Sequence, residues 1–317
     1  MRESPTSAPR WLLWVIFLLI PLGIVQRAQV WPSQPQQNNQ DPIRINVELV
    51  VLHATVLNNE RLPVAGLEKA NFQIYENGVL QEIESFSHED IPVTVGLVID
   101  NSGSMRPRRT EVIAAALAFA RASNPKDQHF LVNFNEYVTF GLPAGMPFTG
   151  DLAQLEVALA TVTANGKTAL YDALAAALEH LKKGKQDKQV LIVVSDGADN
   201  ASQHNAAQII ALAKKSEAII YTIGIFEPDD PDRNPGSLKQ FAKATGGEAF
   251  LPQSVKDTTA ICERIARDIR SQYTLTYEPT SLKYDGNYRT IQVKAKTPGG
   301  EHLYVRTRVG YYAPLKP

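Results

Sequence analysis

The sequence predicts an α/β fold: a doubly wound, mostly parallel sheet flanked by helices, inserted in or flanked by a small β-sandwich-like domain built from both chain ends. Two observations lead to this prediction. Between residues 91 and 271, short apolar runs alternate with amphipathic helical segments, which is the pattern of βα units. Outside this range, residues 43–90 and 272–317 show the two-residue periodicity of strands.

The start of the chain predicts the compartment. Arg2 and Arg10 precede an uncharged run, Trp11–Val25. The run has 15 residues, fewer than the ~20 that span a bilayer comfortably. Residues 1–28 are therefore either a cleaved secretory signal or a retained N-terminal anchor. Because the positive charge precedes the run, both alternatives predict an exported protein: periplasmic, cell-surface or secreted, with membrane contact only through a retained anchor.

A linker and an N-terminal β segment come next. Residues 29–42 are rich in Gln, Asn and Pro and are interpreted as a flexible linker. In residues 43–90, alternation predicts one apolar face that carries Ile43, Ile45, Val47 and Leu49. Glu76-Asn77-Gly78 predicts a hairpin turn, because Asn-Gly tolerates the positive φ that such turns need.

The C-terminal segment, residues 272–317, is also β-structure by its pattern. The stretches QYTLTYEP, YRTIQVKAK and HLYVRTRVGYY are separated by turn signals at Asp285-Gly286-Asn287 and Pro298-Gly299-Gly300. Neither chain end has enough strands for a stable domain, and together they would have about six. We therefore expect the two ends to pair into one β-domain around the central segment.

The central segment, residues 91–271, contains the predicted parallel sheet. Its buried-type strands are VTVGLVID, QHFLVNFN, KQVLIVVSDG and AIIYTIGIF. Its predicted helices are RRTEVIAAALAFARAS, DLAQLEVALATV, TALYDALAAALEHLKK, NAAQIIALAKKSE and VKDTTAICERIARDIRS. An open sheet of this kind places a ligand site outside the carboxyl ends of its strands, where the strand order reverses.

Oxygen-bearing side chains follow the strands of this sheet. Asp100, Ser102 and Ser104 lie on alternate residues at the end of the first central strand, where Gly103 permits a sharp turn. By itself this pattern fits a turn-and-cap motif as well as a cation site. Thr168 opens a predicted helix, and Asp196 ends the strand QVLIVV. Such hard oxygen ligands suit Mg²⁺.

These three pieces, D-x-S-x-S, Gly-x-Thr and S-D-G, resemble the metal-ion-dependent adhesion site of von Willebrand factor type A domains and integrin inserted domains. The resemblance covers about residues 91–271. It implies a site for Mg²⁺, or for Mn²⁺ or Ca²⁺, in which the hydroxyls bind directly or switch in and the aspartates bind directly or through water. The implied ligands are Asp100, Ser102, Ser104, Thr168 and Asp196. One coordination position then stays open for a Glu or Asp of a protein partner. The segment NFQIYENGVLQEIESFS resembles a group of bacterial exported proteins with related domains.

The expected function is therefore an extracytoplasmic, metal-dependent adhesion or scaffold module and not an enzyme. A metal-dependent hydrolase and a structural scaffold without metal are the alternatives. The sequence lacks G-x-S-x-G and G-x-x-x-x-G-K-[ST], and Ser102 occupies the place of the second aspartate of haloacid-type phosphotransferases. A net charge of −1 gives no basic field for nucleic acid.

Three further features are interpreted as structural or left open. Cys262 lies on an apolar helical register and is expected to be a buried small hydrophobe. The acidic, proline-containing run at residues 227–232 fits a solvated loop better than a Ca²⁺ site. Asp199 and Asn200 are either groups that support the metal ligands or ordinary loop residues.

Overall fold

The computed structural model describes residues 49–226, 231–281 and 283–315. All of the described residues belong to one compact unit of the chain, which begins at residue 47. The predicted signal or anchor, the predicted linker, and positions 43, 45, 47 and 227–230 lie outside the described residues. Within the described part, no helix has the length and apolar character needed to cross a membrane.

The central segment forms a sheet of six strands in the order β10-β9-β8-β5-β6-β7. Its strands are β5 (Val93–Asp100), β6 (Gln128–Phe134), β7 (Val138–Phe140), β8 (Lys188–Ser195), β9 (Ile219–Gly224) and β10 (Ala249–Phe250). All neighbours pair in parallel except β6 and β7, which are antiparallel. Along the chain, β5 is followed by β6 on one side, whereas β8 lies on the other side. The strand order therefore reverses between β5 and β8, which is where a ligand crevice is expected.

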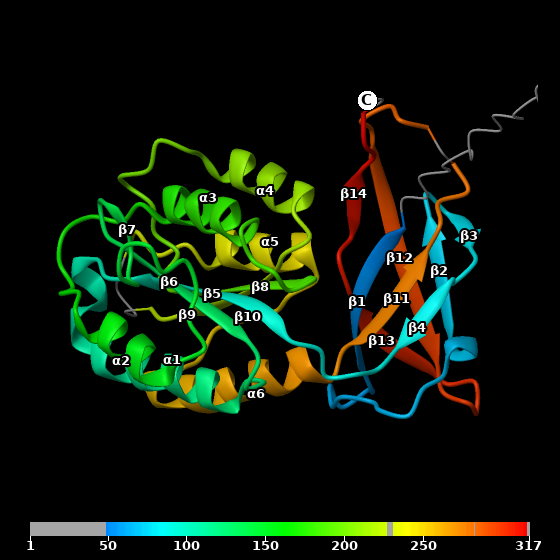
Figure 1. Cartoon of the computed structure of the whole chain (residues 1–317), viewed down its shortest axis with the longest axis horizontal. Helices are drawn as coiled ribbons and strands as arrows, with labels where there is room; N and C mark the ends of the chain where they lie inside the picture. The colour runs from blue at the N-terminus through cyan, green and yellow to red at the C-terminus, as the bar shows by residue number, and fades with distance from the viewer. Residues whose placement is uncertain (1–48, 227–230, 282, 316–317) are drawn as a thin grey trace, which may run out of the picture. The chain divides into compact units, whose positions relative to one another are not determined.

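Helices cover both faces of this sheet (Figure 1). One face packs against α1 (Arg109–Ala122), α2 (Leu152–Ala160) and α6 (Thr258–Arg270). The other packs against α3 (Leu170–Leu181), α4 (Ala206–Lys215) and α5 (Pro235–Thr245). All eight residues of β5 are buried, as expected of a strand covered on both sides.

One helix and two short strands of the central segment were not predicted. The helix α5 begins with Asn234, whose side chain accepts a hydrogen bond from the Ser237 N–H, and has Pro235 in its first turn. It ends at Gly246, which has a φ of 81°. These are ordinary start and stop signals, but the helix between them is polar enough to resemble a loop. The strands β7 and β10 have only three and two residues.

The two chain ends form a second sheet, in the order β3-β2-β12-β13-β1-β11-β4, with β14 paired to β12. Its strands from the N-terminal end are β1 (Val50–Leu57), β2 (Phe72–Glu76), β3 (Val79–Gln81) and β4 (Ser85–Ser87). Those from the C-terminal end are β11 (Tyr273–Tyr277), β12 (Tyr288–Lys296), β13 (His302–Arg306) and β14 (Gly310–Tyr312). Short 3-10 helices lie at Lys69–Asn71, Gly103–Arg108 and Val255–Asp257. Strands from the two ends are interleaved along the sheet, and the sheet has eight described strands where about six were expected.

Strand β1 connects the two halves of this second sheet. Its residues 50–54 pair with β11, and its residues 55–57 pair with β13. The hydrogen bonds therefore form one continuous path, and a sandwich of two separate layers stays a prediction. A single apolar cluster, which includes Leu52, Ile74 and Leu275, contains residues from both chain ends.

Two local predictions have clear outcomes here. The hairpin is confirmed: β2 and β3 are antiparallel, and Asn77 and Gly78 have φ values of 48° and 81°. The predicted apolar face of the first strand is wrong where it can be seen. Leu49 is 49% exposed, whereas Val50, Leu52, Ala54 and Val56 are buried. Because residues 49–52 are all apolar, alternation alone could not choose between the two registers.

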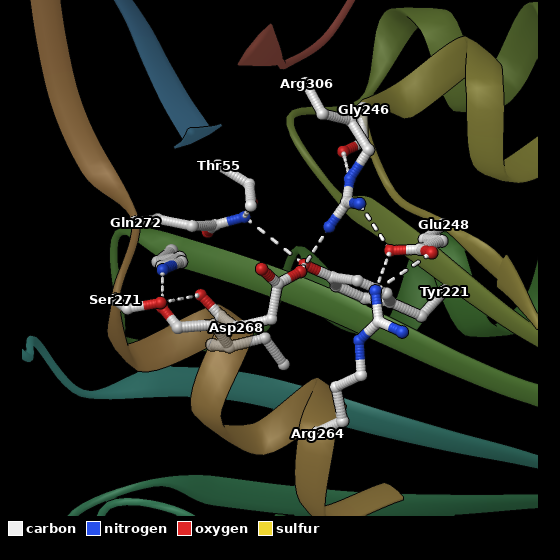
Figure 2. Close-up of polar contacts among 11 residues, drawn as sticks. Thr55, Tyr221, Gly246, Glu248, Arg264, Asp268, Ser271, Gln272 and Arg306 are labelled. Atoms are coloured by element: carbon white, nitrogen blue, oxygen red, sulfur yellow. Dashed lines mark hydrogen bonds and ion pairs between the residues drawn. The ribbon is translucent and has the colours of Figure 1, made fainter. Parts of the chain in front are cut away.

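Polar side chains join β13 to the central segment (Figure 2). The Arg306 guanidinium donates to the carboxylates of Asp268 on α6 and Glu248, and to the Gly246 carbonyl oxygen at 3.2 Å. The Tyr221 hydroxyl of β9 also donates to Asp268, at 2.7 Å. We call Tyr221, Glu248, Asp268 and Arg306 the joint network. Its buried acid, Asp268, is paired with a cation, which lowers the cost of taking the carboxylate out of water.

Candidate metal centre

The strand ends β5 and β8 place two aspartates at the predicted crevice. Asp100 is the last residue of β5, and Asp196 directly follows the last residue of β8. The two strands are adjacent and parallel, with Ile99 opposite Val194. Both aspartates are 2% exposed. Two carboxylates are therefore buried close together at the edge where ligands bind in folds of this kind.

Hydrogen-bond donors hold the Asp100 carboxylate, and no cation among the described residues pairs with it. The Ser195 hydroxyl donates to Oδ2 at 2.6 Å, and the Ser102 backbone N–H donates to Oδ1 at 2.8 Å. Burial and the negative charge of Asp196 raise the Asp100 pKa to about 7, against the opposing effect of these hydrogen bonds. Within the described part of the chain, no cation is among the groups that shift it.

The two serine hydroxyls connect the aspartates. The hydroxyl oxygens of Ser102 and Ser104 are 3.1 Å apart, and the Ser104 hydroxyl donates to Asp196 Oδ2 at 2.6 Å. The other oxygen of Asp196 accepts a hydrogen bond from the Ala198 N–H at 2.9 Å. The turn after β5 therefore places one hydroxyl directly against the carboxylate that follows β8.

The third predicted element, Thr168, is fixed by the loop after β8. Its N–H donates to Asn200 Oδ1 at 2.9 Å, and its carbonyl oxygen accepts from the Asn200 N–H, also at 2.9 Å. The Gly103 N–H donates to the Gly166 carbonyl oxygen at 3.1 Å, which ties this loop to the serine turn as well. Three segments that are distant in the sequence are thus hydrogen-bonded to one another.

A depression of about 210 Å³ opens over these groups. It is lined by Ser102, Gly103, Ser104, Gly166, Lys167, Thr168, Asp196, Ala198, Asn200 and Asp232. Four of the five predicted ligand residues line it, and Asp100 lies behind them in contact with Ser102 and Ser195. The structure therefore brings all five predicted residues together.

The donor set fits a hard divalent cation. Two carboxylates and three hydroxyls are oxygen ligands, which Mg²⁺, Mn²⁺ and Ca²⁺ prefer. Two buried carboxylates without a cation are costly, and a bound cation would compensate them. Among the described residues, no group of three or more His, Cys, Asp or Glu side chains could hold a metal ion. A cation at this site would therefore depend on the hydroxyls as well as on the aspartates.

The described lining differs from the active site of a serine hydrolase. A nucleophilic serine needs a base in hydrogen-bond contact, and the described lining includes no histidine. Among the described residues, the Ser104 hydroxyl contacts the Ser102 hydroxyl and donates to the Asp196 carboxylate. Oxygen atoms of this kind are the ligands that a hard cation prefers.

Sequence reasoning missed one supporting residue and left another open. Ser195 holds Asp100, and its position directly before Asp196 in Ser-Asp-Gly was the available signal. Asn200 fixes the Thr168 backbone, so it supports the site and is more than an ordinary loop residue. Asp199 instead accepts hydrogen bonds from the Tyr171 N–H and the Ser202 hydroxyl.

Two other predictions concern groups outside the five ligands. Cys262 is buried, as expected, and burial raises its pKa to about 12, so the thiol stays protonated and unreactive. Of the acidic run at residues 227–232, the described Asp232 lines the depression. The remainder through residue 230 lies outside the described residues.

Comparison with known proteins agrees with this geometry. Residues 95–198 match the family model of the von Willebrand factor type A domain. A von Willebrand factor type A structure from Catenulispora acidiphila has 16% sequence identity and a TM-score of 0.51, and the match covers 83% of this chain and 73% of that one. The sequence matches no curated protein.

Two further solved structures show similar folds. Proximal thread matrix protein 1 from the mussel byssus has 16% identity and a TM-score of 0.50, over 62% of this chain and 51% of that one. The vWF domain of the type V pili tip protein Mfa5 from Porphyromonas gingivalis has 17% identity and a TM-score of 0.48, over 57% and 95%. At these identities the likeness concerns the fold alone.

Proposed function

The chain contains a von Willebrand factor type A domain, and we propose that it is an extracytoplasmic binding module whose divalent cation captures a carboxylate of a protein partner. The cation would be Mg²⁺, or Mn²⁺ or Ca²⁺, and the partner would present an Asp or Glu side chain. The exported location rests on the basic flank and apolar run at the start of the sequence.

One observation carries the proposal: Asp100 and Asp196 are buried close together, and neither has an ion-pair partner among the described residues. These two carboxylates, with the hydroxyls of Ser102, Ser104 and Thr168, would hold the ion. A site with so few charged ligands leaves the ion able to attract a further anionic oxygen. Lys167, which lines the same depression, adds a positive charge beside the incoming carboxylate.

Binding of acetate, a simple carboxylate, to the metal-loaded protein tests this function without knowledge of the partner. When Mn²⁺ occupies the site and acetate coordinates it, the paramagnetic ion accelerates relaxation of the acetate methyl protons. We expect this acceleration with the Mn²⁺-loaded full chain, and we expect little for acetamide, which has no negative charge. The measurement is proton relaxation of each probe as the protein concentration rises.

Matched variants make the result specific. Asp196→Asn removes a proposed ligand and should abolish the acceleration. Asp187→Asn removes the same charge from an exposed loop position and should leave it unchanged. Equal effects on acetate and acetamide, or no effect of Asp196→Asn, would show that carboxylate capture does not occur at this site.

A further inference from the structure

A second depression, of about 320 Å³, carries a concentrated positive charge. It lies between the end of α4, the start of β1, and residues of β12, β14 and the loop near Ser281. Its lining contains five cationic side chains and one carboxylate: Lys214, Lys215, Lys283, Arg289, Arg308 and Glu217. It shares no residue with the candidate metal centre.

Only part of this positive charge is neutralised. Arg289 pairs with the buried Glu76 at 3.2 Å and donates to backbone carbonyl oxygens, so its role is structural. Glu217 is 66% exposed and approaches Arg308 only at 3.8 Å. Lys214 and Lys215 form no ion pair with any described residue and instead lie over tyrosine rings, at 4.7 and 5.8 Å from the ring centroids. A depression with such an excess of one sign attracts ligands of the opposite sign.

One buried donor in this lining lacks an acceptor. The Arg308 Nε–H is buried and has no hydrogen-bond partner among the described residues. The Arg308 side chain is 14% exposed, and burial lowers the pKa of its guanidinium. Buried polar groups are nearly always hydrogen-bonded, so such an exception needs an explanation. An anion in the depression would supply the missing acceptor.

Aromatic rings form another part of the same lining. Tyr284 and Tyr312 line the depression and are 39% and 36% exposed, and the Arg308 guanidinium lies 5.6 Å from the centroid of the Tyr311 ring. Exposed tyrosine faces stack against flat or apolar ring surfaces. The volume is at the lower end of the range for small-molecule sites and is too small for a folded partner.

We propose that this depression binds a small organic anion that combines an acid group with a ring. Lys214, Lys215 and Arg308 would hold the acid group, and Tyr284 and Tyr312 would contact the ring. An aromatic phosphate and a sugar phosphate share this chemistry. The proposal does not depend on the metal centre, because it uses none of the five residues proposed to bind the cation.

Isothermal titration of the full chain, in the presence of a chelator and about 0.15 M salt, tests the proposal. The probes are phenyl phosphate, glucose 6-phosphate, inorganic phosphate, and the neutral compounds phenol and glucose. We expect at least one ring phosphate to saturate a single site with an affinity at least about tenfold higher than that of inorganic phosphate. The neutral compounds should not saturate it. The ring phosphate that binds more tightly shows whether the site prefers an aromatic ring or a sugar ring.

Variants locate the site. Lys214 and Lys215 are not in the core, so the double variant Lys214→Gln/Lys215→Gln should fold and weaken the better ring phosphate at least about tenfold. Lys126→Gln, which removes a charge from an exposed loop elsewhere, should have no effect. Tyr284→Ala should weaken the ring phosphate but not inorganic phosphate. The proposal is overturned if neither ring phosphate saturates, if both bind no better than inorganic phosphate, or if the double variant binds as the wild type does.

Discussion

Two pairs of acidic side chains differ in how their charge is compensated. In the joint network, the buried Asp268 and the partly exposed Glu248 both accept hydrogen bonds from the Arg306 guanidinium. At the strand ends, the buried Asp100 and Asp196 accept hydrogen bonds from hydroxyls and backbone N–H groups. Among the described residues, the first pair has a cation and the second pair has none.

This difference separates a structural acid pair from a binding site. A buried carboxylate beside an arginine is complete once the chain has folded, and it gains nothing from an added cation. A buried pair that lacks a cation raises the free energy of the folded state, and a cation from solution can relieve that cost. The proposed metal site therefore rests on the strand-end pair and not on the joint network.

The largest expected effect comes from breaking the compensated pair. Arg306→Met leaves the buried Asp268 without its ion-pair partner and should lower the free energy of unfolding by about 3–5 kcal/mol. The measurement is urea unfolding of the full chain. Arg264 also contacts Glu248, at 3.3 Å, but is 47% exposed, so Arg264→Met should cost less than about 1 kcal/mol. Equal costs would mean that burial does not distinguish the two arginines.

Removing a charge from the strand-end pair should raise the free energy of unfolding rather than lower it. Asp100→Asn keeps the side-chain shape and removes a buried charge. The comparison is made at pH 8 with a chelator present, so that no metal is bound. We expect the variant to be about 2 kcal/mol more stable than the wild type, after allowance for weakened hydrogen bonds to Ser195 and Ser102. Added Mg²⁺ should stabilise the wild type alone. A metal-free variant less stable than the wild type would contradict the account.

The pH dependence of the metal-free protein follows from the same carboxylate. The Asp100 pKa rises from 3.8 to about 7 on folding, so between these values the folded chain holds a proton that the unfolded chain has lost. The contribution of Asp100 to the free energy of unfolding is fully present below pH 3.8 and is lost as the pH rises to about 7. Relative to Asp100→Asn, the wild type should lose up to about 1.4 kcal/mol per pH unit in this window. The pKa of Asp127 also rises on folding, to about 6. Because Asp127 is present in both proteins, its contribution cancels when their free energies of unfolding are subtracted.

The smallest expected effect concerns the hydroxyl behind the site. Ser195→Ala removes the donor that orients Asp100 but leaves every proposed ligand in place. We expect Mg²⁺ affinity to fall about tenfold, which titration calorimetry measures. Ser123→Ala is the control, because Ser123 is also buried and its hydroxyl donates to the Phe119 carbonyl oxygen, away from the proposed ligands. A similar loss in both variants would point to general destabilisation.

The sequence predicted the candidate ligands better than the groups that support them. Asp100 and Asp196 follow apolar strands, and the carboxyl ends of parallel strands meet at one edge, so their approach could be predicted. Asn200 could not be assigned, because its bond to Thr168 depends on how two loops face each other. The pairing of Arg306 with Asp268 was not foreseen either, because Asp268 lies on helix α6 of the central segment and Arg306 lies on β13 of the second sheet.

Local apolar pattern was also insufficient in two places. Four consecutive apolar residues at 49–52 allowed either face of β1 to be buried, and packing against β11 and β13 decided the register. The helix α5 was missed because Pro235 and Gly236 at its start resemble a turn, although Asn234 and Gly246 mark its ends. In both cases tertiary contacts supplied what the local sequence left undecided.

The most direct test of the central claim is isothermal titration of Mg²⁺ and Mn²⁺ into the chelator-treated full chain, beside Asp100→Ala. Acetate is present in all titrations, so that a site needing a carboxylate to complete it can still bind. The account predicts saturable binding of one ion per chain in the wild type and none in Asp100→Ala. No saturable binding in the wild type, or equal binding in the variant, would contradict it and leave the central domain as a scaffold without a metal.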